Sequence, residues 1–112
     1  MAKLQNYING KWQPSAGTDT LPVMNPATGN LLGQVPLSTG DDLDQAAAAA
    51  AEAFKAWRRV PPVERIQPLF QLKILLEQHR DMLARIITQE CGKTIKESNG
   101  ELQRAIENIE VA

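Results

Sequence analysis

The sequence predicts an α+β fragment in which one or two short β-hairpins are followed by three or four amphipathic helices. Two observations lead to this expectation. Turn signals alternate with β-prone residues up to about residue 39, and from residue 40 onward apolar residues recur at the spacing of a helix. With 112 residues, the chain is about one domain long.

The first hairpin is marked by Asn9-Gly10. This dipeptide lies between β-prone residues, and both central residues of a type I′ turn need a positive φ, which Asn and Gly tolerate best. A second hairpin is expected from residues 21–24 and 31–35. The segment 25–29 between them holds a proline that fixes φ and ends in a glycine that allows the chain to reverse.

The first helix is expected to begin after Thr39, whose hydroxyl can cap it. Asp41 and Asp42 then favour the positive end of the helix dipole. Apolar residues follow at helical spacing and form one face, namely Leu43, Ala46, Ala47, Ala50, Phe54 and Trp57. Pro61-Pro62 ends this helix and opens the next.

The second helix carries a wide apolar stripe and one proline. The stripe comprises Ile66, Leu69, Phe70, Leu72, Leu75 and Leu76. Pro68 lies inside this pattern and cannot donate a helical hydrogen bond. We therefore expect either a kink or a late helix start at this position.

The third helix is expected from about Arg80 to Glu90. Gly92 suits the left-handed residue that follows a helix, and Lys93 lies beside the negative end of the dipole. The residues expected to be buried are Leu83, Ile86 and Ile87.

The fourth helix has a capping box at its start, formed by Thr94 and Glu97. Ser98 and Glu101 repeat the pattern, which offers an alternative start four residues later. The residues expected to be buried are Ile95, Leu102, Ile106 and Ile109. The pattern is still in period when the chain reaches Ala112, without a stop signal, so we expect that the chain ends inside an element.

The composition argues against several classes of protein. The formal net charge is −1 and the basic residues are scattered, so nothing favours binding to nucleic acid or to an anionic membrane. No apolar run approaches the ~18 residues of a membrane span, and the first residues do not form a signal peptide. Cys91 is the only cysteine, which excludes an intramolecular disulfide and favours a reducing compartment. We therefore expect a cytoplasmic protein.

Few residues could carry chemistry. Cys91 lies at the negative end of the third helix, which disfavours a reactive thiolate, and the one histidine, His79, lies across most of that helix. His79 has no second ligand at metal-binding spacing. The glycines form neither G-x-G-x-x-G nor a P-loop, so no cofactor is expected to bind this chain alone. No catalytic residue and no metal site are predicted.

Arg104 has two interpretations. It lies about 200° of helical rotation from Leu102 and Ile106, so it points away from the predicted buried face. A surface arginine would pair with Glu101 and Glu107, three residues away on either side. A functional arginine would instead offer its guanidinium as a bidentate donor to a substrate carboxylate. Periodicity alone favours the surface pair.

Five short motifs, in this order and at this approximate spacing, resemble the opening of the aldehyde dehydrogenase superfamily. They are Tyr7-Ile8-Asn9-Gly10-Lys11-Trp12, Asn25-Pro26-Ala27-Thr28-Gly29, Ala53-Phe54-Lys55-Ala56-Trp57, Pro61-Pro62-Val63-Glu64-Arg65 and Glu90-Cys91-Gly92-Lys93. Three further segments look like its CoA-acylating methylmalonate-semialdehyde dehydrogenase branch. They are Gln34-Val35-Pro36-Leu37-Ser38, Leu69-Phe70-Gln71-Leu72-Lys73 and Gly100–Glu110. Cys91 and Pro68 depart from the residues usual in the family, without touching its chemistry.

This resemblance implies an enzyme that oxidises a carboxylated semialdehyde with NAD, by attack of a cysteine, and passes the acyl group to CoA. Residues 1–112 would be the N-terminal part of the α/β NAD-binding domain of a homo-oligomer, with hairpins over 1–39 and helices over 40–112. The nucleophilic cysteine and the cofactor loops would lie in the rest of the parent polypeptide, so the chain alone should be inactive. Arg104 matches the arginine that this branch is thought to use for the substrate carboxylate.

Two other hypotheses remain open from the sequence. The chain could belong to a non-acylating aldehyde dehydrogenase, which a general-base glutamate near the downstream cysteine would reveal. It could instead be a stand-alone helical interaction module from a truncated gene. Four apolar stripes in so short a chain could leave one exposed for a partner.

Overall fold

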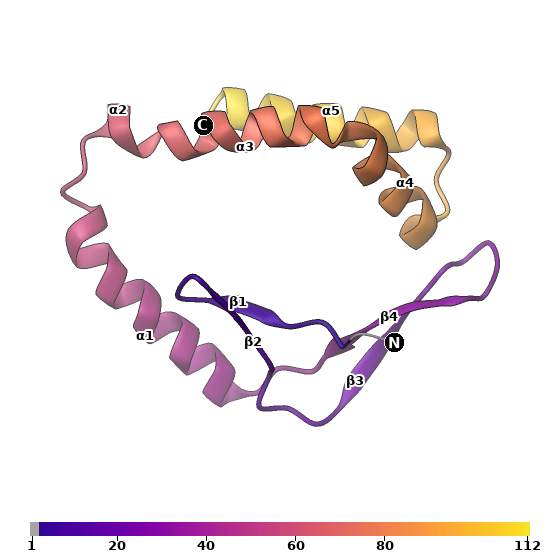
Figure 1. The fold of residues 1–112 in the computed structure, drawn as a ribbon, viewed down its shortest axis with the longest axis horizontal. Helices are drawn as coiled ribbons and strands as arrows, with labels where there is room; N and C mark the ends of the chain where they lie inside the picture. Colours follow the sequence, from indigo (N-terminus) through magenta and orange to yellow (C-terminus); the bar gives the residue numbers. More distant parts are fainter. Residues whose placement is uncertain (1–2) are drawn as a thin grey trace. The chain divides into compact units, whose positions relative to one another are not determined.

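The computed structural model describes residues 3–112 and confirms the predicted α+β class (Figure 1). In this part of the chain, four short strands precede five helices. Two compact units divide the chain. The first comprises Leu31–Val60 and the described residues up to Met24, and the second comprises Asn25–Asn30 and Pro61–Ala112. None of the helices in residues 3–112 combines the length and the apolar character needed to cross a membrane.

The first predicted hairpin consists of β1 (Asn6–Ile8) and β2 (Lys11–Gln13), which pair antiparallel. The two turn residues, Asn9 and Gly10, have φ angles of 51° and 75°. Both angles are positive, as a type I′ turn requires. The prediction from the Asn-Gly dipeptide is therefore confirmed.

The second predicted hairpin consists of β3 (Thr20–Met24) and β4 (Leu31–Pro36), which also pair antiparallel. In the turn between them, the side chain of Asn25 accepts a hydrogen bond from the backbone N–H of Ala27 over 2.9 Å. Gly29 has a φ of 74°, in the left-handed region that a glycine enters without strain. The predicted glycine reversal is confirmed.

The helix α1 (Gly40–Trp57) begins as predicted. Thr39 is the N-cap, and its hydroxyl accepts a hydrogen bond from the backbone N–H of Asp42. In return, the Asp42 carboxylate accepts one from the backbone N–H of Thr39. This reciprocal capping box satisfies N–H groups that no helical carbonyl can reach.

The apolar face predicted for this helix is largely uncovered in the described chain. Leu43 is 70% exposed, Phe54 is 57% exposed and Trp57 is 47% exposed. Within its unit, α1 contacts β1, and a groove beside that contact is lined by small residues such as Ala46 and Ala49. Periodicity identifies the apolar side of a helix, but it does not say which segment covers that side.

The region around Pro68 is split into two helices. A single turn, α2 (Pro62–Arg65), is separated by Ile66 from α3 (Gln67–Gln78). Pro68 lies in the first turn of α3, where its missing N–H removes no helical hydrogen bond. Of the two outcomes that the sequence allowed, the structure shows the late start.

The last two helices are α4 (Arg80–Cys91) and α5 (Ile95–Glu110), close to the predicted bounds. Gly92 follows α4 with a φ of 74°, which confirms the predicted left-handed residue. Thr94 is the N-cap of α5 and forms a complete capping box with Glu97. The chain therefore turns between the two helices through only three residues.

A small core joins these two helices within the second unit. Its buried apolar residues are Ala84, Leu102 and Ile106. Ser98, which the sequence offered as an alternative helix start, lies fully buried inside α5, and its hydroxyl lies 2.9 Å from that of Thr88 in α4. The alternative start was wrong, because the capping box at Thr94 begins the helix one turn earlier.

Two predictions of burial were also wrong. Ile86 in α4 is 40% exposed, and Ile95, the first residue of α5, is 47% exposed. The buried residue of α4 is instead Ala84. The distance between packed helices depends on the side chains at their contact, and a small residue allows a close approach. The buried face predicted for α4 comprises only large aliphatic residues and leaves out Ala84.

Candidate functional site

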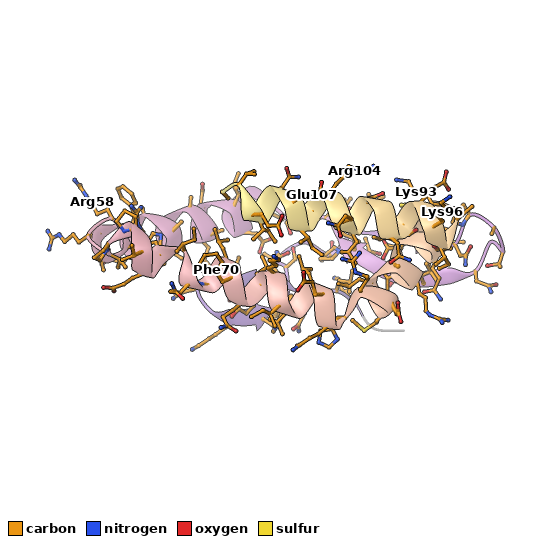
Figure 2. All side chains as sticks on the ribbon, turned by 90° about the horizontal axis from the view of Figure 1, so that it is seen from above. Arg58, Phe70, Lys93, Lys96, Arg104 and Glu107 are labelled. Atoms are coloured by element: carbon orange, nitrogen blue, oxygen red, sulfur yellow. The ribbon has the colours of Figure 1, made fainter. Side chains whose placement is uncertain are left out.

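Arg104 is the residue that the sequence offered for substrate binding, and α5 carries it on an exposed face. The buried residues of the same helix, Leu102 and Ile106, lie on the other side. Figure 2 labels Arg104 on the outer side of α5, away from α3. Its guanidinium is therefore accessible to a ligand in the described chain.

The carboxylate of Glu101, three residues before Arg104, is engaged elsewhere. It accepts a hydrogen bond from the ammonium of Lys93, and the two groups form an ion pair. This hydrogen bond raises the pKa of Lys93 and lowers the pKa of Glu101, since each group stabilises the charged form of the other.

The carboxylate of Glu107, three residues after Arg104, also has another partner. It accepts a hydrogen bond over 3.2 Å from the side-chain amide of Gln103. The carbonyl oxygen of that amide accepts a hydrogen bond over 2.9 Å from the guanidinium of Arg80 in α4. The amide of Gln103 is thereby oriented with its donor side toward Glu107.

These contacts contradict the interpretation of Arg104 as one half of a surface pair. Among residues 3–112, no carboxylate forms an ion pair with its guanidinium. A guanidinium has five N–H donors in a planar fork, and two of them can bind both oxygens of one carboxylate. Arg104 is thus available for a bidentate contact with an anionic ligand.

Asp42 is a buried charge whose main partners the sequence did not reveal. The residue is 7% exposed, and its carboxylate accepts hydrogen bonds from the hydroxyl of Ser15 over 2.7 Å and from the backbone N–H of Ala16 over 3.0 Å. The bond from Ala16, followed by those from Thr39 and Ser15, lowers the pKa of Asp42 from 3.8 to about 2. Asp42 therefore ties the loop before β3 to the start of α1, which is a structural role.

The backbone approaches itself closely beside this loop. A Cβ atom at Gly17 would lie 2.0 Å from the carbonyl oxygen of Leu37. The N–H of Leu37 donates a hydrogen bond to the carbonyl of Asp19 over 2.9 Å, which holds this crossing of the two segments in place. Gly17 is therefore required for space.

The described residues do not fit NAD or a metal ion. No group of three or more His, Cys, Asp or Glu side chains within residues 3–112 could hold a metal. Both sheets in this part are antiparallel hairpins, whereas a dinucleotide normally binds where a parallel strand leads into a helix. Cys91 and His79 are exposed at opposite ends of α4.

Comparisons with known proteins agree with one another. The model of the aldehyde dehydrogenase family matches residues 12–112. Malonate-semialdehyde dehydrogenase 1 of Geobacillus kaustophilus is 50% identical over 109 residues, which are 97% of this chain and 22% of that protein. Malonate-semialdehyde dehydrogenase of Bacillus subtilis is 51% identical over 110 residues, which are 98% of this chain and 23% of that protein.

Solved structures share the fold. Methylmalonate-semialdehyde dehydrogenase from Oceanimonas doudoroffii matches with a TM-score of 0.92 at 41% identity, over 99% of this chain and 22% of that one. A protein from Sinorhizobium meliloti 1021 in complex with NAD matches with a TM-score of 0.93 at 31% identity, over 99% and 23%. The chain spans about a fifth of the length of these relatives. Because the family model covers far more than half of its residues, the chain belongs to the aldehyde dehydrogenase family.

Proposed function

We propose that this chain is the N-terminal segment of an NAD-dependent, CoA-acylating dehydrogenase that oxidises malonate or methylmalonate semialdehyde. Residues 1–112 would form the N-terminal part of its NAD-binding domain, with hairpins over 1–39 and helices over 40–112. The names of the relatives support the substrate class, and the related protein in complex with NAD supports the cofactor.

Arg104 would bind the carboxylate of the semialdehyde. The observation that carries this proposal is that Arg104 is exposed and unpaired within residues 3–112, while both neighbouring glutamates have other partners. Malonate semialdehyde differs from an ordinary aldehyde by a carboxylate. A guanidinium recognises that group by its charge and by two parallel hydrogen bonds. The segment would thus contribute substrate selectivity.

The remaining polypeptide would supply the reactive groups. The described residues do not fit a dinucleotide, and their one cysteine lies exposed at the end of α4. The nucleophilic cysteine and the sites for NAD and CoA would therefore lie in the part of the relatives that this chain does not match. We further propose that the complete protein is a cytoplasmic homo-oligomer, and we expect the 112-residue chain to show no dehydrogenase activity alone.

The test is a chimera in which this chain replaces the segment it matches in the Bacillus subtilis malonate-semialdehyde dehydrogenase. We expect the chimera to oxidise malonate semialdehyde with NAD and CoA. Arg104→Gln should lower kcat/KM for malonate semialdehyde about 10- to 100-fold, because a hydrogen bond to a charged group contributes about 1.5–3 kcal/mol. Propanal lacks the carboxylate, so its kcat/KM should change less than about twofold.

Arg85→Gln is the matched control, because it removes an exposed arginine from the neighbouring helix α4. It should leave both aldehydes unaffected. An equal effect of Arg104→Gln on both aldehydes would contradict the carboxylate role. A folded chimera that oxidises neither aldehyde would contradict the assignment of the segment.

A further inference from the structure

Two carboxylates on α5 could compete with a ligand for the guanidinium of Arg104. Glu101 and Glu107 lie three residues before and after it, at the spacing that favours an ion pair along a helix. An arginine engaged in such a pair has fewer donors free for another carboxylate, and part of its charge is neutralised. The guanidinium of Arg104 is therefore free to bind a ligand carboxylate only if these two glutamates have other partners.

Lys93 binds the first of these competing carboxylates, that of Glu101. It is one of the three residues between α4 and α5, so its position follows from the left-handed turn at Gly92 and from the N-cap at Thr94. From this turn its ammonium reaches Glu101, eight residues further along the chain, and forms an ion pair with it. Figure 2 labels Lys93 at the end of α5 where the helix begins, on the same outer side as Arg104.

The contact to the second competitor is of a different kind. Glu107 accepts its hydrogen bond from the neutral amide of Gln103, whereas Glu101 is bound by a full positive charge. The contact at Glu101 joins two opposite full charges, whereas the donor at Glu107 is neutral, so only Glu101 gains the additional attraction between charges. Lys93 is therefore the residue whose loss should change the surroundings of Arg104 most.

We propose that Lys93 is a positioning residue, which holds Glu101 away from Arg104 and so leaves the Arg104 guanidinium free for the substrate carboxylate. This inference rests on the proposed function, in which Arg104 binds that carboxylate. If the ammonium of Lys93 is removed, Glu101 can form an ion pair with Arg104, which lies three residues further along the same helix. The intrahelical pair then competes with the substrate for the same donors.

The experiment uses the same chimera and measures KM and kcat separately. Lys93→Gln should raise the KM for malonate semialdehyde about twofold, which corresponds to the strength of one helix-surface ion pair, and should leave kcat unchanged. The double variant Lys93→Gln with Glu101→Gln should restore the original KM, because the competitor is gone. Lys93→Arg keeps the positive charge and should behave like the parent chimera.

Glu101→Gln alone separates the pairing from a general effect of charge. Lys93 could instead act only by attracting the anionic substrate through its positive charge. In that case, removing the negative charge of Glu101 would also favour the substrate and lower the KM for malonate semialdehyde. Under the proposal that KM changes little, because the Glu101 carboxylate forms its ion pair with Lys93 and none with Arg104. Activity with propanal shows for every variant that the protein is folded.

The outcomes distinguish a failure of the role proposed for Arg104 from a failure of the role proposed for Lys93. If Arg104→Gln does not change the preference for the carboxylated aldehyde, the proposed function fails and the role of Lys93 fails with it. If Arg104→Gln has its expected effect but Lys93→Gln leaves the KM unchanged, only the role of Lys93 is overturned. A raised KM that the double variant does not restore also overturns it.

Discussion

Gly17→Ala should destabilise the first unit, although it adds only one methyl group. The new Cβ would lie 2.0 Å from the carbonyl oxygen of Leu37, and Cβ atoms in proteins essentially never come within 3.0 Å of such an atom. The neighbour is backbone and cannot turn aside as the end of a flexible side chain would. The two segments must therefore separate by about 1 Å.

The magnitude follows from what that separation disturbs. Gly17 directly follows Ser15 and Ala16, which donate hydrogen bonds of 2.7 Å and 3.0 Å to the Asp42 carboxylate. A shift of about 1 Å takes these contacts beyond hydrogen-bonding distance. Steric overpacking of this kind costs about 1–3 kcal/mol. We expect Gly17→Ala to lower the free energy of unfolding of this unit by that amount.

The matched control is Gly33→Ala in β4. A Cβ at Gly33 would meet no atom within 4 Å, and its backbone is not in the left-handed region. Restricting the unfolded chain should then stabilise the unit by about 0.4–1 kcal/mol. The same chemical change is thus expected to have opposite signs at the two glycines.

Urea unfolding of the 112-residue chain, followed by tryptophan fluorescence and near-UV circular dichroism, measures this unit selectively. Both tryptophans, Trp12 and Trp57, and the one tyrosine, Tyr7, belong to the first unit. The rings of Tyr7 and Trp12 lie 4.9 Å apart, so their dichroism reports on the first hairpin. Equal stability of the two alanine variants would refute the steric reasoning.

Two further predictions concern the helix starts. The pKa of Asp42 is lowered from 3.8 to about 2, so its carboxylate stabilises the folded state above its ordinary pKa, and this contribution is lost as the pH falls through the folded-state value. The stability of the first unit, measured by urea unfolding at each pH, should therefore fall between about pH 4 and pH 2, and Asp42→Asn should remove this dependence. Thr94→Ala should destabilise α5 by about 1 kcal/mol and speed hydrogen exchange at its first N–H groups, whereas Thr94→Ser should not. Unchanged exchange in Thr94→Ala would mean that the capping box does not hold this helix end.

Local signals in the sequence located the starts of α1 and α5 and the end of α4, whereas the helix boundary near Pro68 stayed open between two outcomes. Thr39, Gly92 and Thr94 each act on the backbone within a few residues, so spacing alone revealed their roles. Burial was harder to predict. Leu43 and Phe54 lie on the expected apolar face, yet both are exposed in the described chain. Periodicity identifies the apolar face of a helix but not the segment that covers it.

The surroundings of the charged residues depended on contacts that are distant in sequence. The bond from Ser15 to Asp42 spans 27 residues, and no local pattern links the two positions. At Arg104 the rule for residues three apart suggested a pair with Glu101, but Lys93 competes for the same carboxylate from the preceding turn. The sequence therefore identified the candidate residue, whereas only the structure showed that its neighbours were occupied.

The location of Cys91 allows the 112-residue chain to be used for energy-transfer measurements, with the tryptophans as donors and a dye on Cys91 as acceptor. Its thiol is exposed at the end of α4 in the second unit, and it is the only cysteine in the sequence, while both indole rings lie in the first unit. A maleimide dye would therefore attach at one defined point without any mutation. In the 112-residue chain, resonance energy transfer from the tryptophans to that dye would then report the distance between the two units in solution.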